Sequence, residues 1–156
     1  DELIPPTLVY PRTKLASEEA LLALYREQGL DVRILRLPFV YGASDPHIEE
    51  ALPFMKEWNP TKQLSIGHHE DVDQALLLAA TTPGIGGRTY NVADDYPVRV
   101  AELFQITGQP EQVAPEGGWP AFNQWDMIQD TTRIKTELNF RPKYPSIYVA
   151  RDLDAL

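Results

Sequence analysis

A helix, a glycine turn and a strand follow one another near the start of this chain. Residues 10–28 carry apolar side chains at helical spacing, which predicts a helix with one apolar face. The members of this stripe are Leu15, Ala16, Ala20, Leu21, Leu24 and Tyr25. Gly29 suits the end of that helix, and residues 32–37 are typical of a strand. Together these elements predict an α/β fold with a parallel sheet.

The rest of the chain continues in the same manner. Further helices are predicted from Asp45-Pro46 to about Trp58, from Asp71 as N-cap to about residue 82, over 98–107, from Asp130 to Leu138 with Asn139 as its stop, and after Ser146 as N-cap. Strands are predicted over 63–66 and 88–92, loops over 38–42 and 108–125, and an extended, proline-broken approach over 1–9.

Composition bounds the function. A length of 156 residues suits one domain, and a formal net charge of −9 argues against nonspecific binding to nucleic acid or to an anionic membrane. The absence of cysteine excludes disulfides and thiolate metal sites and fits a reducing compartment such as the cytoplasm. No apolar run is long enough to span a bilayer.

Tyr10 and Lys14 lie one helical turn apart on the same face of the predicted helix. A phenol beside an ammonium forms a proton-transfer pair, because the cation favours the phenolate. The same spacing also occurs at an exposed helix start with a solvated lysine, so the pair alone is weak evidence.

Two other groups of polar residues have structural interpretations. The run from His68 to Asp71 contains ligand-type side chains, but adjacent residues rarely converge on one ion, and Asp71 has a better use as a helix cap. We therefore predict no metal site. We expect Arg36 to be an ion-pair partner within the fold rather than a substrate ligand.

Several segments, in order, resemble the C-terminal half of extended short-chain dehydrogenases/reductases, the NAD-dependent epimerase/dehydratase group. They are Tyr10-x-x-x-Lys14 with Ala16-Ser17-Glu18, Leu35 to Gly42, His68 to Val72, Arg88 to Ala93, and a tail from Asp130 to Pro142. The likeness covers essentially the whole chain. It implies a Rossmann-like parallel sheet, of which this chain is the C-terminal part, plus a small substrate-binding region.

The resemblance also implies roles for individual residues. Tyr10 would be the catalytic acid/base, and Lys14 would favour its ionised form and hold the nicotinamide ribose of NAD or NADP. Leu37, Pro38 and Val40 would line the nicotinamide, partly through backbone groups. The helix over residues 10–28 would pack in a homodimer interface, although an ordinary core helix explains its apolar stripe equally well.

The expected partner is a small-molecule substrate. Nucleotide-sugar members of the family usually carry Asn where Phe39 stands and place an Arg before the segment that matches His68–Asp71, and residues 62–67 contain none. Phe39 therefore suggests a less polar substrate, or one held differently, while a nucleotide sugar stays an alternative. Tyr41 either lines the substrate pocket or belongs to the core.

The family's glycine-rich phosphate loop, acidic ribose-binding residue and catalytic Ser/Thr would all lie upstream of Asp1, and no G-x-G-x-x-G occurs here. We expect residues 1–156 to be the C-terminal catalytic and substrate-binding portion of a longer enzyme. Alone it would be inactive and would expose apolar surface. One alternative is a non-catalytic dinucleotide-binding sensor or scaffold of the same fold. Another is a structural or interaction module with a fortuitous Tyr/Lys pair.

Overall fold

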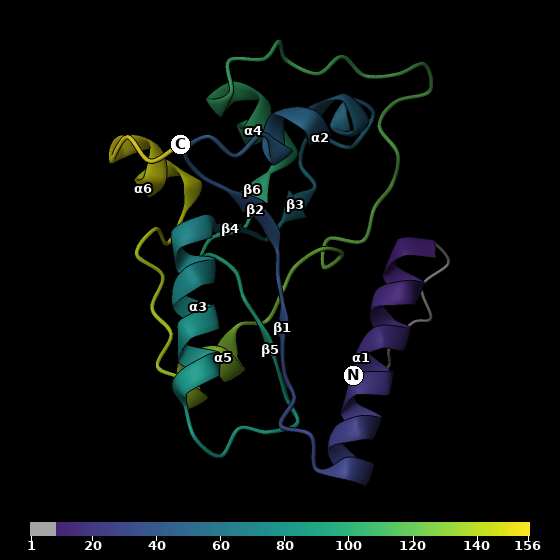
Figure 1. Cartoon of the computed structure of the whole chain (residues 1–156). Coiled ribbons are helices and arrows are strands. Elements are labelled where there is room, and N and C mark those ends of the chain that lie inside the picture. The colour runs from purple at the N-terminus through teal and green to yellow at the C-terminus, as the bar shows by residue number, and fades with distance from the viewer. Residues whose placement is uncertain (1–8) are drawn as a thin grey trace.

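A computed structural model describes residues 9–156. At its centre lie two consecutive strands, which pair with different partner strands. The first half, β1 (Arg33–Arg36), pairs in parallel with β5 (Arg88–Asn91). The second half, β2 (Phe39–Tyr41), pairs in parallel with β4 (Ile66–His68). Figure 1 shows β1 and β2 following one another along the middle of the molecule. The predicted α/β fold with parallel strands is confirmed.

The change of partner occurs at Pro38. The ladder to β5 closes with the Val92 N–H donating to the Arg36 carbonyl at 3.0 Å, and proline has no N–H with which to continue a ladder. Pro38 instead packs over Gly67, where a Cβ would lie 2.7 Å from the Pro38 Cγ. The prediction of a loop over 38–42 is therefore wrong for residues 39–41, which form β2.

Two helices flank the β1–β5 pair, α1 (Val9–Gln28) and α3 (His69–Thr81). They lie on opposite sides of it in Figure 1. The side chains of β1 confirm that the two helices lie on opposite faces. Arg33 donates to the carbonyls of Ala79 and Ala80 near the end of α3, whereas Arg36, three residues later, donates to Glu18 of α1. The predicted helix and strand near the start of the chain are thus confirmed as two adjacent layers.

A second group of elements packs around β2 and β4. It comprises β3 (Gln63–Leu64) and β6 (Val98–Arg99), which pair antiparallel, and the helices α2 (His47–Met55), α4 (Val100–Ile106) and α6 (Ile147–Asp152). A separate short helix, α5 (Thr132–Glu137), packs with α3 and β5. Each group has its own buried core. The core around β2 and β4 is built on Tyr41, Leu64, Ile66, Leu103 and Ile147. The core between β5, α3 and α5 is built on Ala75, Tyr90, Ile134 and Phe140.

Two helix starts differ from the predictions by two residues or more. Val98 and Arg99, predicted as helical, form β6, because pairing with β3 outweighs the local pattern, and Glu102 accepts from the Arg99 N–H at 2.7 Å as α4 begins. The N-cap of α3 is His68 rather than Asp71. Asp71 instead accepts hydrogen bonds from a distant segment, as described below.

Other local predictions hold. Ser146 caps α6 by accepting from the Val149 N–H, and Asn139 adopts a left-handed φ of 53° after α5. Of the approach predicted over residues 1–9, residues 1–8 lie outside the described part, and Val9 already belongs to α1. Within residues 9–156, no helix has both the length and the apolar character that crossing a membrane requires.

Candidate functional site

Tyr10 and Lys14 occupy the first turns of α1. The helical spacing brings the Lys14 Nζ to 5.3 Å from the centre of the Tyr10 ring. Pro11, which suits a first helical turn, follows Tyr10 directly, and Tyr10 is 72% exposed. The two side chains therefore lie together at the N-terminal end of α1, with the phenol accessible.

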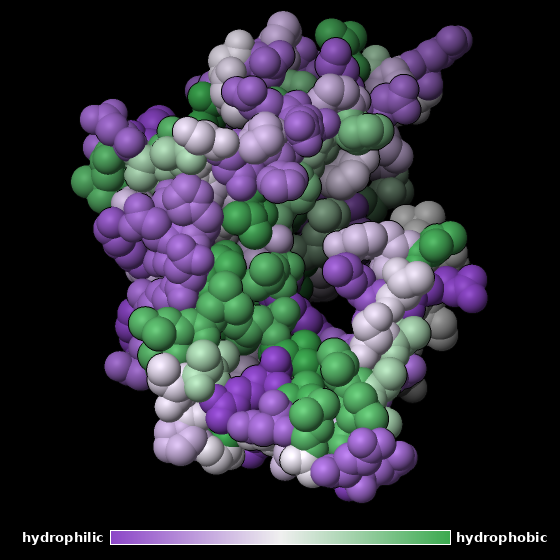
Figure 2. Space-filling model, in the orientation of Figure 1, coloured by the Kyte–Doolittle hydropathy of each residue, from purple (hydrophilic) through white to green (hydrophobic). Residues whose placement is uncertain are grey.

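A groove of about 420 Å³ separates this part of α1 from β1. Figure 2 shows the hollow between the helix and the rest of the molecule, with apolar surface beside it. Its lining comes from one face of α1 and from the end of β1: Tyr10, Lys14, Ser17, Glu18, Leu21, Ile34, Leu35, Arg36 and Leu37. The Tyr–Lys pair and the carboxyl end of a parallel strand thus share one groove, and ligands of open α/β folds bind at that end.

The ion pair between Glu18 and Arg36 bridges this groove. One Glu18 carboxylate oxygen accepts from the Arg36 Nε at 2.9 Å, and the other accepts from its terminal nitrogen at 2.6 Å. This bidentate ion pair raises the pKa of Arg36, chiefly through the hydrogen bond to Glu18. The expected role of Arg36 as an ion-pair partner within the fold is confirmed.

Residues after β1 divide between the groove and the cores. Leu37 is 46% exposed and lines the groove. Successive side chains of β2 point to opposite faces, so Val40 packs against the core under α3, whereas Phe39 packs against the other core. Both side chains are partly buried by these contacts.

Tyr41 is buried, with 1% of its surface exposed. Its hydroxyl donates to Asp94 at 2.8 Å, and its ring borders a second cavity, of about 290 Å³, together with Ile48 and Leu156. Burial favours the core interpretation of Tyr41. Contact with a substrate from the second cavity stays a prediction.

Asp94 lies at the centre of a buried polar cluster. It is 6% exposed and accepts from the Tyr41 hydroxyl and, at 3.3 Å, from the His68 backbone N–H. Burial raises the pKa of Asp94 to about 7, although both hydrogen bonds pull it downward. Burial and the neighbouring Asp94 together raise the pKa of Tyr41, so its hydroxyl stays a neutral donor that joins β2 to the residues after β5.

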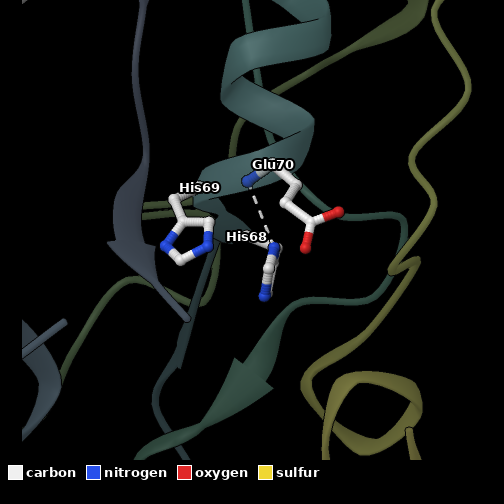
Figure 3. Close-up of side chains that lie close together, drawn as sticks. All are labelled: His68, His69 and Glu70. Atoms are coloured by element: carbon white, nitrogen blue, oxygen red, sulfur yellow. Dashed lines mark hydrogen bonds between the residues drawn. The ribbon is translucent and has the colours of Figure 1, made fainter. Parts of the chain in front are cut away.

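Figure 3 shows His68, His69 and Glu70 at the start of α3. One ligand-type atom from each lies within 4.8 Å of the others, close enough for a single ion. However, His68 Nδ1 accepts from the Glu70 N–H at 3.2 Å, and Nε2 lies 2.9 Å from the Ala155 carbonyl, to which it donates. Both ring nitrogens of His68 are engaged, so no lone pair is left for a metal.

A contact between Gln129 and Leu37, just after β1, could not be predicted from the sequence pattern. The side-chain nitrogen of Gln129 donates to the Leu37 carbonyl at 3.4 Å, while the Gln129 backbone N–H donates to the Ser65 hydroxyl at 2.9 Å. Gln129 belongs to the long irregular segment after α4, and only the tertiary fold brings it beside β1. Its side-chain oxygen is buried without a hydrogen-bond partner among residues 9–156.

Comparison with known families places these elements in context. A family model matches residues 1–93, a span that includes α1, β1, β2, β4 and β5, and it describes the NAD dependent epimerase/dehydratase family. The chain belongs to this family. The resemblance inferred from the sequence motifs is thereby confirmed.

Individual proteins that resemble this chain are distant from it in sequence. An uncharacterized protein, y4nL, of Sinorhizobium fredii is 26% identical in an alignment 111 residues long, which covers 66% of this chain and 31% of that protein. A short-chain dehydrogenase/reductase superfamily protein from Agrobacterium tumefaciens, solved with bound NAD, has a TM-score of 0.73 at 20% identity, over 97% of this chain and 58% of that one. UDP-glucuronic acid 4-epimerase from Bacillus cereus, in complex with NAD, has a TM-score of 0.68 at 19% identity, over 92% of this chain and 50% of that one.

These likenesses establish the fold. The chain spans about a third of the curated relative and between half and three-fifths of the two solved proteins.

Proposed function

We propose that this chain is the C-terminal portion of an NAD(P)-dependent oxidoreductase, epimerase or dehydratase. In this enzyme Tyr10 and Lys14 would act as the acid/base pair that transfers a proton. The observation that carries the proposal is the shared groove, in which a phenol and an ammonium face the exit of a parallel strand. Membership of the epimerase/dehydratase family and the fold shared with NAD-bound proteins support it.

The residues around the groove fit the nicotinamide end of a dinucleotide. Lys14 supplies a cation and Tyr10 a hydroxyl for ribose oxygens, and the exposed Leu37 supplies an apolar wall for a flat ring. Pro38 and the backbone of Val40 would orient that ring. When bound, NAD(P) supplies or accepts a hydride at the nicotinamide.

Proton movement would fall to the Tyr–Lys pair. The Tyr10 hydroxyl gives a proton to the substrate oxygen, or takes one from it, as the carbon beside that oxygen changes oxidation state. The Lys14 ammonium stabilises the phenolate that this transfer leaves behind. Because Tyr10 lines the groove and is 72% exposed, a substrate can reach it from solvent.

The substrate is a small molecule that contacts Phe39 and, through the second cavity, Tyr41. A nucleotide sugar is one candidate, because the solved Bacillus cereus relative is named for one. The apolar Phe39 favours a less polar compound instead.

The upstream half of the proposed enzyme would complete the sheet. The Val32 and Arg36 carbonyls accept from the residues that flank β5 in the chain. The backbone groups of Arg33 and Leu35 therefore point to the opposite edge of β1, since successive residues alternate. No strand in the described part of the chain pairs with that edge. Upstream strands would cover it, and α1, with its exposed apolar side chains, would also serve as a homodimer interface.

Replacement of Tyr10 in the complete gene product tests the catalytic assignment. Tyr10→Phe removes the hydroxyl and keeps the ring, so kcat should fall at least about 100-fold if general acid–base catalysis is its role. Tyr25→Phe, on the same helix, is the matched control and should keep its turnover. Turnover of Tyr10→Phe equal to that of the wild type would refute the assignment.

The same preparation separates the alternatives. Binding of NAD(H) or NADP(H), measured by fluorescence titration, together with turnover supports the enzyme. Binding without turnover of any tested carbonyl or alcohol substrate would favour the sensor or scaffold. No binding by the complete product would favour the structural module.

A further inference from the structure

We propose that Glu18 and Arg36 are positioning residues, which hold the Tyr10–Lys14 end of α1 at a set distance from the exit of β1. This inference rests on the proposed function of the Tyr–Lys pair. It concerns a different kind of role, because neither Glu18 nor Arg36 needs to touch a substrate or cofactor.

The first observation is the weak attachment of α1 to the rest of the molecule. None of its residues is buried, although the helix is 20 residues long. Near its C-terminal end, the ring of Tyr25 packs against Gly87, where a Cβ would lie 2.4 Å from the ring. That contact anchors one end of the helix and leaves the Tyr10 end dependent on other contacts.

The second observation is the position of the ion pair along α1. Tyr10, Lys14 and Glu18 follow one another at intervals of one turn, so all three lie on the face that lines the groove. Across the groove, Arg36 is the last residue of β1 and directly precedes Leu37. The two hydrogen bonds between Glu18 and Arg36 are the side-chain hydrogen bonds that join α1 to the sheet in the described part of the chain.

The length of α1 makes the position of Tyr10 sensitive to a small tilt of the helix. Tyr10 lies about 22 Å along the helix axis from the anchor at Tyr25 and about 12 Å from Glu18, at a rise of about 1.5 Å per residue. A tilt of about 5° around the anchor would therefore move Tyr10 by about 2 Å. Misplacement of a catalytic group by about 1 Å can cost two orders of magnitude in rate.

Chemistry also favours positioning over simple stabilisation. The side chains of Arg36 and Glu18 are 41% and 16% exposed, and partly exposed ion pairs contribute little to folding stability. A bidentate pair of hydrogen bonds between a guanidinium and a carboxylate, however, fixes the relative orientation of the two groups as well as the distance between them. Loss of the pair should therefore change where Tyr10 stands more than whether the protein folds.

Three variants of the complete gene product test the proposal: Glu18→Gln, Arg36→Lys and the exchanged pair Glu18→Arg/Arg36→Glu. Both single variants should lower kcat at least about tenfold and leave KM for the cofactor within about threefold, since only alignment is lost. The exchanged pair should recover most of the lost kcat. Glu19→Gln, at an exposed neighbouring position of α1, is the control.

Amide hydrogen exchange provides a readout that does not depend on catalysis. Exchange over residues 9–17 should quicken in Glu18→Gln and Arg36→Lys, return towards the wild-type rate in the exchanged pair, and stay unchanged in Glu19→Gln. Inactive wild-type protein, or a fully active Tyr10→Phe variant, would count against the proposed function and leave this exchange result intact.

Two results would overturn the positioning role. One is kcat within about twofold of the wild type in both single variants. The other is a loss of kcat that the exchanged pair does not repair, because the two residues would then act separately.

Discussion

Asp94 is a carboxyl group for which burial and hydrogen bonding act in opposite directions. It lies among Tyr41, the His68 backbone and the carboxylates of Asp71 and Asp95. Removal from water and the two like charges disfavour its ionised form, while the two hydrogen bonds favour it, and the balance leaves its pKa at about 7. A group whose pKa is raised by folding makes stability fall as pH rises through the folded-state value.

Asp94→Asn should remove this dependence on pH. Wild-type protein should lose stability relative to the variant between about pH 4 and pH 7, because its unfolded chain ionises Asp94 well before the folded chain does. The difference should change by at most about 4 kcal/mol across that range, from a pKa of 3.8 to one of about 7. Urea denaturation at several pH values measures it, with the exposed Asp73→Asn as control. A difference that stays flat with pH would contradict the shifted pKa.

At the scale of elements, Asp71 ties the start of α3 to the chain before α6. Its carboxylate is 2% exposed and accepts from the Lys143 N–H at 2.6 Å and from the Tyr144 N–H at 3.0 Å. Next to it, Glu70 forms an exposed ion pair with Lys143. The C-terminal segment is thus fastened to the β4–α3 junction through a buried carboxylate, with the His68–Ala155 hydrogen bond as a second attachment.

Asp71→Asn should loosen this attachment. An amide presents one acceptor oxygen in place of two, so the N–H of Lys143 or Tyr144 loses its partner, at a cost of up to about 1–3 kcal/mol. The melting temperature should fall, and limited proteolysis should cut first within residues 141–146. Glu70→Gln, which removes only the exposed ion pair, should have a much smaller effect. Equal effects of the two variants would contradict the role given to Asp71.

For the whole molecule, several large apolar side chains are exposed on the helices and beside the strand β1. Exposed apolar side chains flank the groove and both helical layers: Leu21, Tyr25, Leu30, Leu37, Leu76 and Leu77. Leu21 and Tyr25 lie on α1, Leu76 and Leu77 lie on α3, and Leu30 and Leu37 lie on either side of β1 in the sequence. Such a surface is typical of a molecule that buries it against further protein.

The isolated chain should therefore behave as an incomplete unit. It should bind an apolar fluorescent dye and associate at high concentration, and the amides of α1 should exchange faster than those of α3. In the complete gene product the dye signal should disappear and α1 should be protected. Light scattering, dye fluorescence and hydrogen exchange test this, and a strictly monomeric, dye-silent fragment would contradict it.

Local physics is sufficient for much of this protein. Apolar spacing predicts α1, Gly29 its end, and β-type composition predicts β1 and β5, because each signal acts between residues close in the chain. The Tyr10–Lys14 neighbourhood follows in the same way, since one helical turn brings them together whatever surrounds the helix.

Contacts between distant segments decided the rest. Tertiary pairing made a strand of residues 39–41, moved Asp71 from cap to anchor, buried Tyr41 against Asp94 and placed Gln129 beside Leu37. None of these follows from neighbours in the sequence, because each depends on a partner that only the folded sheet brings within hydrogen-bonding distance. The sequence by itself thus determined most of the elements and the Tyr–Lys pair, and the tertiary structure determined the remaining strands and what each element faces.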